Sequence, residues 1–307
     1  MKVLITPRSY GKHSDIPFTM LDEKGVRFSV NDTGDIMSEA ALREAIADVD
    51  GVIIGVEPLT ADILSAAPGV RAISKYGVGT DNIDLAYCER AGIKVSKATG
   101  ANSEAVADYT FTLMLTLARK VLVIDRECRR RNWKKITTTD VANKTLGLIG
   151  LGAIGRNVVQ RAKGFNMEVL AYDVYWDEPY AQDAGVTYAE VDEICQKADF
   201  ISLHVPLLDE TRHIIDAHRI AQMKPDAYIV NTARGGLIDE DALLTALIEE
   251  RIGGAGLDVF AQEPPADERW YDLDNVILGS HCAASTIGAS DNMGVIATRN
   301  LIKDLGL

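Results

Sequence analysis

Three polar side chains in the final third of the chain have the types needed for acid–base chemistry on a carbonyl that carries a carboxylate. Arg234 lies within 231–236, Glu263 precedes two prolines, and His281 lies within 279–286. Each follows an apolar run that is typical of a buried strand. A guanidinium suits bidentate binding of a carboxylate. A carboxylate bonded to an imidazole fixes its tautomer and stabilises the imidazolium, so we expect Glu263 and His281 to act as an acid–base pair.

The chain has five histidines, so His281 must be weighed against the other four. His13 and His218 lie in polar stretches typical of a surface, and His213 lies in a short loop. His204 also ends an apolar run and is the serious rival. The three residue types have simpler explanations as well: a solvated turn carboxylate, a surface arginine and a satisfied core histidine.

A glycine-rich turn upstream predicts a dinucleotide site. The apolar run 145–150 is followed by a helix that opens on Gly150, Gly152 and Gly155. These glycines permit the tight turn, the approach of a pyrophosphate and close helix–strand packing, respectively. Asp173 ends the next strand about 20 residues on, where an acid binds a ribose 2′-hydroxyl. No arginine stands beside Asp173 to receive a 2′-phosphate, which favours NAD over NADP; a βα turn without a ligand is the alternative.

A second glycine turn lies within 75–84, after a strand-like run. The backbone N–H groups around Gly77 and Gly79 could bind a carboxylate. The alternative is a tight turn with Asp81 as a helix cap. The basic run 129–131 has a simpler explanation, because cations at the C-terminal end of a helix oppose its dipole.

Two alternating series of strands and helices must position these residues. The first series has expected strands at 2–5, 26–30, 51–55, 70–74 and 93–95, and a long helix is expected at 103–131. The second has expected strands at 145–150, 168–172, 200–204, 228–231, 254–258 and 275–278, with helices at 154–164, 188–196 and 239–250. Short strands alternating with helices predict parallel sheets.

The expected fold is α/β, with two doubly wound parallel-sheet domains. A five-stranded flavodoxin-like layer suits the first series and a Rossmann dinucleotide-binding layer suits the second. The terminal helical segment comes too late for the second sheet and is expected to return to the first. This makes the first domain discontinuous, with the second domain inserted in it.

Composition is that of a globular chain with two cores: 307 residues, 47% hydrophobic and 25% charged. A net charge of −13 disfavours nucleic acid and anionic membrane surfaces as partners. No apolar run reaches the roughly 18 residues of a membrane span, and the N-terminus lacks a signal-peptide pattern. Four scattered cysteines argue against disulfides and a metal site and favour a cytoplasmic location.

In this order the motifs resemble the D-isomer-specific 2-hydroxyacid dehydrogenases. The likeness extends over nearly the whole chain and runs through 76–84, 100–102, 106–108, 150–155, 204–207, 231–236, 256–260, 263–264 and His281. The resemblance implies hydride transfer between NAD and a small D-2-hydroxy acid or its 2-oxo acid. It also implies a substrate domain of 1–99 plus 286–307, an NAD-binding domain of 100–285 inserted in it, and a homodimer joined through the NAD-binding domain.

The resemblance further implies roles for individual residues. Catalysis falls to Arg234, Glu263 and His281, and Arg234 also binds the substrate carboxylate. The other substrate contacts fall to Tyr76, Gly77, Val78, Gly79 and Asn102. The cofactor contacts fall to Gly150, Gly152, Ala153, Ile154, Gly155, Asp173, His204, Val205, Pro206, Thr211, Thr232, Ala233, Asp258 and Ala283. His204 thereby becomes a neighbour of the cofactor rather than a rival catalyst.

Within that family the sequence is closest to phosphoglycerate dehydrogenase-like and hydroxypyruvate- or glycerate-type members. Many phosphoglycerate enzymes carry an arginine in the segment held here by 55–58, where Glu57 would repel a phosphate. Arg8 and Lys12 in the first loop could supply a replacement cation. Two further possibilities stay open: an NAD-sensing, corepressor-like scaffold and a formate- or phosphite-type dehydrogenase.

Overall fold

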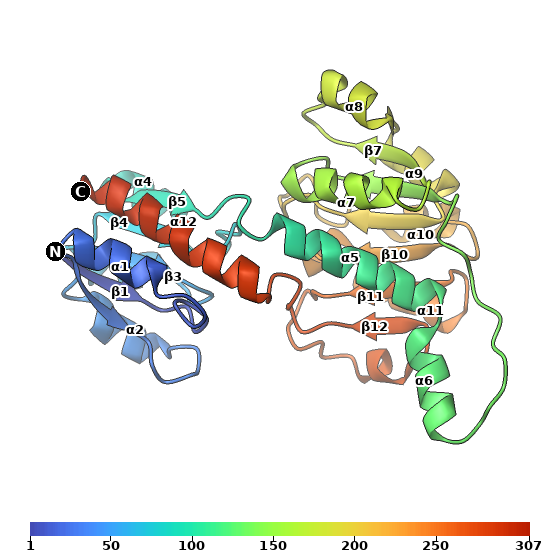
Figure 1. Cartoon of the computed structure of the whole chain (residues 1–307), viewed down its shortest axis with the longest axis horizontal. Coiled ribbons are helices and arrows are strands. Elements are labelled where there is room, and N and C mark those ends of the chain that lie inside the picture. The colour runs from blue at the N-terminus through green and yellow to red at the C-terminus, as the bar shows by residue number, and fades with distance from the viewer. The chain divides into compact units, whose positions relative to one another are not determined.

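The computed structural model describes all residues from 1 to 307. The chain divides into two compact units: the first unit is Met1–Asn102 with Ala284–Leu307, and the second unit is Ser103–Ala283 (Figure 1). Each unit is built on one parallel β-sheet with apolar cores on both faces. The predicted α/β class with two parallel-sheet domains is therefore confirmed.

The sheet of the first unit has the strand order β2-β1-β3-β4-β5, which is the order of flavodoxin-like folds. Its strands are β1 (Lys2–Ile5), β2 (Arg27–Val30), β3 (Gly51–Ile54), β4 (Ala72–Lys75) and β5 (Lys94–Lys97). Its helices are α1 (Ile16–Glu23), α2 (Glu39–Ile46), α3 (Ala61–Ser65), α4 (Leu85–Ala91) and α12 (Ile287–Leu305). Helices α1 and α12 cover one face, and residues of α2, α3 and α4 pack on the other.

The terminal helix α12 belongs to the first unit. Its N-terminus is capped by Thr286, whose hydroxyl accepts the Ala289 N–H. Its buried face includes Leu301, which is fully buried and packs over Gly51, where an added Cβ would come within 3.1 Å of the leucine. The Tyr10 hydroxyl meets the Thr298 hydroxyl at 2.5 Å. Apolar burial and these polar contacts together hold α12 against the first sheet.

The sheet of the second unit has the strand order β12-β11-β10-β9-β6-β7-β8. Its strands are β6 (Thr145–Ile149), β7 (Glu168–Tyr172), β8 (Val186–Tyr188), β9 (Phe200–Leu203), β10 (Tyr228–Asn231), β11 (Gly254–Leu257) and β12 (Val276–Leu278). Its α-helices are α5 (Ser103–Ala118), α6 (Val121–Arg129), α7 (Ala153–Lys163), α8 (Glu178–Ala184), α9 (Val191–Lys197), α10 (Ala217–Gln222) and α11 (Glu240–Ile248). Short 3₁₀ helices cover Gly235–Leu237 and Glu268–Asp272. The order reverses at β6, as in a dinucleotide-binding sheet.

Two sequence-based expectations were wrong in detail. The helix expected at 103–131 is broken, because Lys120 adopts a left-handed conformation with φ of 47° between α5 and α6. Apolar residues recur on both sides of this break, so their periodicity does not reveal it. The helix expected from Tyr188 begins only at Val191, and Tyr188 ends the short edge strand β8. None of the helices combines the length and apolarity that a membrane crossing requires.

Candidate active site

The structure brings Glu263 and His281 into direct contact. The Nδ1 atom of His281 lies 2.9 Å from Oε2 of Glu263, and the two side chains are 50% and 40% exposed. The other oxygen of Glu263 accepts the Phe260 N–H at 3.2 Å. Because a carboxylate only accepts, Nδ1 must carry a proton, and Nε2 is the ring nitrogen that gains or loses one.

Asp258 holds the segment that carries the histidine. Its main-chain oxygen accepts the His281 N–H at 2.8 Å, and its carboxylate oxygens accept the N–H groups of Cys282 at 2.9 Å and Ala283 at 2.8 Å. His281 itself adopts a left-handed conformation with φ of 56°. An added Cβ at Gly279 would lie 2.3 Å from Oδ1 of Asp258, so only glycine fits there. The sequence assigned Asp258 to the cofactor alone and missed this role.

Arg234 lies in a tight turn after β10. Its guanidinium donates to the Ala233 carbonyl at 2.7 Å. The side-chain amide of Asn231 accepts the Ala233 N–H at 3.0 Å and donates to the Arg234 carbonyl at 2.8 Å, which holds the turn closed. The next residue, Gly235, packs so closely on the backbone of 260–261 that an added Cβ would be 2.0 Å from a carbonyl carbon. The arginine turn and the loop that leads to Glu263 therefore touch.

Strand order places the turns that carry Arg234, Glu263 and His281 at one edge of the sheet. Strands β10, β11 and β12 are parallel neighbours, and Arg234, Glu263 and His281 each follow one of them. The carboxyl ends of parallel strands share one edge of a sheet, which is where open α/β sheets bind ligands.

The glycine turn has the geometry that a pyrophosphate needs. Gly150 has φ of 107° and sits against the His204 carbonyl, while an added Cβ at Gly155 would lie 2.2 Å from Gly150 O. Gly152, by contrast, faces open space. No side chain caps the N-terminus of α7, so its N–H groups are available to an anion. A dinucleotide phosphate fits this cradle.

Asp173 lies at the end of β7, directly beside this turn. Its carboxylate accepts the Leu151 N–H at 2.7 Å and the Tyr175 N–H at 2.9 Å. These bonds fix a negative charge where a ribose would lie. The nearby Arg156 is paired with Asp177 at 2.7 Å. The arrangement suits ribose hydroxyls better than a 2′-phosphate.

His204 follows β9 and is half-buried. Its Nε2 lies 2.9 Å from the Ser202 hydroxyl, and its Nδ1 is buried without a partner. Burial lowers the pKa of His204 to about 3. A lowered pKa favours the uncharged ring, which has no acidic imidazolium proton to give near neutral pH.

The remaining residues assigned to the cofactor lie in loops or at the start of a helix in the second unit. The Thr211 hydroxyl donates to the Pro206 carbonyl at 2.6 Å and accepts the Leu208 N–H at 2.8 Å, which closes the loop 206–211 directly after Val205. The hydroxyl of Thr232 lies 3.2 Å from that of Thr110 on α5. Ala153 and Ile154 begin α7.

The glycine loop assigned to the substrate lies in the first unit, at the carboxyl end of β4. Gly77 has φ of 130°, its carbonyl accepts the Ala98 N–H at 2.9 Å, and Val78 is 39% exposed. The Tyr76 hydroxyl donates to Ser290 O at 2.8 Å. Gly79 continues the loop, and the side-chain oxygen of Asn102 is buried without a hydrogen-bond partner.

Glu57 does not present its charge to solvent. It is 2% exposed, and its carboxylate accepts the Thr6 hydroxyl at 2.6 Å. Asn82 donates to the Glu57 carbonyl at 2.6 Å and accepts from Lys75 at 2.7 Å. Lys75 also donates to the Gly55 carbonyl. The sequence predicted that Glu57 would repel a phosphate, and sequence reasoning missed this buried hydrogen-bond network.

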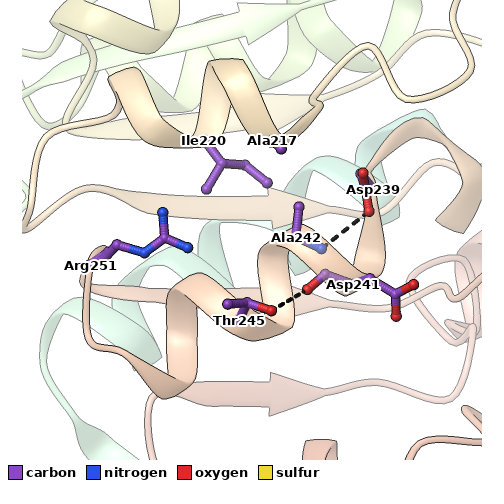
Figure 2. A pocket seen from close by; sticks show the side chains of 7 residues that line it. All are labelled: Ala217, Ile220, Asp239, Asp241, Ala242, Thr245 and Arg251. Atoms are coloured by element: carbon purple, nitrogen blue, oxygen red, sulfur yellow. Dashed lines mark hydrogen bonds between the residues drawn. The ribbon is translucent and has the colours of Figure 1, made fainter.

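A hollow of about 400 Å³ lies elsewhere in the second unit, between α10 and α11. Figure 2 shows its lining, in which Asp239 caps the Ala242 N–H and Thr245 bonds the Asp241 carbonyl. These bonds belong to the start of α11, and no residue of the predicted site lines the hollow. We assign it no catalytic role.

Known proteins resemble this chain over most of its length. The family description "D-isomer specific 2-hydroxyacid dehydrogenase, NAD binding domain" matches residues 111–283. A hydroxypyruvate reductase of Thermotoga maritima is 39% identical, over 90% of this chain and 91% of that protein. A D-3-phosphoglycerate dehydrogenase of Methanocaldococcus jannaschii is 43% identical over 88% of this chain, which spans only 52% of that longer protein. A D-lactate dehydrogenase from Aquifex aeolicus, crystallised with NAD and lactic acid, gives a TM-score of 0.83 with 31% identity over 97% of this chain and 93% of that one.

The lowered pKa of His204 predicts a loss of stability in acid. The unfolded histidine binds a proton below its ordinary pKa near 6.5 and the folded one does not, so stability falls as pH drops from there toward 3. The slope is up to about 1.4 kcal/mol per pH unit. Urea unfolding of a His204→Gln variant at pH 6, 5 and 4 should show a shallower decline than the unmodified chain. A His13→Gln control, at an exposed site, should leave the decline unchanged; equal slopes in all three proteins would contradict the assignment.

Proposed function

The chain belongs to the D-isomer-specific 2-hydroxyacid dehydrogenases, and we propose that it uses NAD to interconvert a small D-2-hydroxy acid and its 2-oxo acid. The observation that carries the proposal is the 2.9 Å contact between His281 and Glu263, on the sheet that also carries the glycine turn. A proton-transfer group and a dinucleotide cradle on one sheet are what this reaction needs.

Each side chain of the site has its own proposed role in this reaction. The chemistry that bound NAD supplies is hydride transfer to or from the carbon of the substrate carbonyl. Arg234 binds the substrate carboxylate and polarises the carbonyl oxygen. During reduction, His281 gives the proton on Nε2 to that oxygen, and Glu263 stabilises the imidazolium beforehand. During oxidation, neutral His281 takes the hydroxyl proton back. The Gly77–Gly79 loop is our proposed second contact for the carboxylate.

NAD is the cofactor that the second unit suits. The open N-terminus of α7 and Gly152 would receive the pyrophosphate, and Asp173 would receive the ribose hydroxyls. A 2′-phosphate would meet the Asp173 carboxylate at close range. The fixed charge of Asp173 therefore supports NAD over NADP.

The test of the assignment is a His281→Asn variant. We expect kcat for 2-oxo acid reduction with NADH to fall about 100-fold or more, since general acid catalysis contributes at least that much. Affinity for NADH, measured by fluorescence titration, should stay within about twofold because the ring lies outside the dinucleotide cradle. A His218→Asn variant is the matched control. Near-normal turnover of several 2-oxo acids by the His281 variant would contradict the assignment.

We propose that the substrate has three carbons and carries a hydroxyl or a phosphate on the third. The buried, bonded state of Glu57 supports the phosphorylated option by removing its carboxylate from the surface. Exposed Arg8 follows β1 at the same sheet edge as the Gly77–Gly79 loop. The neighbouring Ser9 hydroxyl donates to the Tyr76 hydroxyl at 3.0 Å, so the two loops are in contact.

This substrate proposal predicts a selective effect at Arg8. An Arg8→Gln variant should raise KM for 3-phosphohydroxypyruvate about tenfold, because a charge-assisted hydrogen bond to a phosphate is lost. The KM for hydroxypyruvate should change less than about twofold. Arg27→Gln, at the opposite end of the same sheet, is the control for net charge. An equal change in both KM values would contradict a role for Arg8 in phosphate recognition.

We also propose that the chain forms a homodimer through the second unit. Helix α6 has no buried residue, and Val121, Leu122 and Trp133 are 48%, 56% and 87% exposed. Large apolar side chains left this exposed on α6 and shortly after it are the kind that an interface between copies would cover. Light scattering on the intact chain should give twice the chain mass of 33.3 kDa, and the mass of one chain would contradict the proposal.

The thiols support a cytoplasmic location for the enzyme. All four cysteines are free in the structure, as is usual in a reducing compartment. Cell fractionation with an antibody against the chain checks this, and recovery outside the cytoplasm would contradict it.

A further inference from the structure

Glu240 is hydrogen-bonded to the loop that carries Glu263 of the proposed catalytic pair. It is the first residue of α11, after the capping residue Asp239, and it is partly buried. Its Oε1 accepts the Ala261 N–H at 2.6 Å. Ala261 lies in the loop that runs from β11 to Glu263, so helix α11 is fastened to that loop.

Two carboxylates each accept one of two consecutive backbone N–H groups of this loop. Glu263 accepts the N–H of Phe260, and Glu240 accepts that of Ala261. Gly235 presses on the same two residues with no room for a Cβ. The loop is therefore held between a helix terminus and a tight turn, with Glu263 projecting toward His281.

We propose that Glu240 is a positioning residue of the active site. It holds the loop that aims Glu263 at His281, and it places a second negative charge behind that pair. The proposal rests on the roles proposed for Glu263 and His281, because a residue can position a proton relay only if the relay exists.

The charged groups around Glu240 come from three elements. Glu263 faces it from the β11 loop, His213 from the loop before α10, and Asp241 from α11 itself. Burial is the main cause that raises the pKa of the Glu240 carboxyl; the Ala261 N–H and His213 oppose it, and Asp241 and Glu263 add to it. Like charges disfavour each other's ionised forms, so the Glu240 charge acts on the same group of side chains as the Glu263 charge.

This coupling has a consequence for the proton donor. A second carboxylate charge favours an extra proton on the Glu263–His281 pair, and reduction needs that proton on the imidazole. Glu240 therefore keeps the pair protonated to a higher pH than Glu263 alone would.

Two variants separate the bond from the charge. Glu240→Gln keeps an oxygen for the Ala261 N–H and removes the charge, whereas Glu240→Ala removes both. In Glu240→Gln, the alkaline fall of kcat/KM for 2-oxo acid reduction should move about half a pH unit lower. Loss of a nearby carboxylate charge disfavours the protonated imidazole. Its kcat on the plateau should stay within about twofold. Glu240→Ala should show the same movement with a roughly tenfold loss of plateau kcat, the scale of a lost loop contact. Asp241→Asn, exposed on the same helical turn, is the control.

A second readout does not depend on turnover. Titration of the His281 imidazole in the intact chain, followed by NMR, should move to lower pH by the same half unit in Glu240→Gln. A His281 titration that is unchanged in Glu240→Gln overturns the proposal. Absence of any NADH oxidation with 2-oxo acids in the unmodified chain would instead overturn the proposed function, and the titration would still decide the role of Glu240.

Discussion

The buried carboxylate of Asp258 organises the segment that carries the proposed proton donor. A buried charge is costly unless it is bonded, and here both oxygens accept backbone N–H groups, from Cys282 and Ala283. Hydrogen bonds to a charged group contribute about 1.5–3 kcal/mol each. The left-handed conformation of His281 costs about 1–3 kcal/mol, so the two bonds outweigh it. Satisfying Asp258 thus fixes the backbone that presents His281 to Glu263.

The parallel sheet then determines which other residues can join. Because β10, β11 and β12 are neighbours, the turns after them share one edge, and the proposed catalytic residues Arg234, Glu263 and His281 all lie on that edge. Gly235 brings the first two turns into van der Waals contact. A side chain at Gly235 would force them apart. The chemistry therefore depends on small residues and strand order as much as on the reactive groups.

Short sequence patterns predicted much of the fold, and the features they missed have physical causes. Strand pattern and glycine spacing predicted the two parallel sheets and the turn at Gly150, because both depend on neighbours in sequence. The break at Lys120 was missed because apolar residues recur on both sides of it. The burial of Glu57 depends on Thr6, 51 positions away, and the position of Glu240 depends on how α11 meets the loop after β11. Such contacts exist only once the sheets have formed, so no local pattern reports them.

The central claim is that Glu263 fixes the tautomer of His281 and leaves Nε2 to exchange protons with the substrate. Nitrogen-15 NMR of the intact, histidine-labelled chain reads this directly at a pH where the ring is neutral, because protonated and unprotonated ring nitrogens differ widely in chemical shift. The account predicts a proton on Nδ1 of His281 and a lone pair on Nε2. A neutral His281 ring protonated on Nε2, with Nδ1 bare beside Glu263, would contradict it.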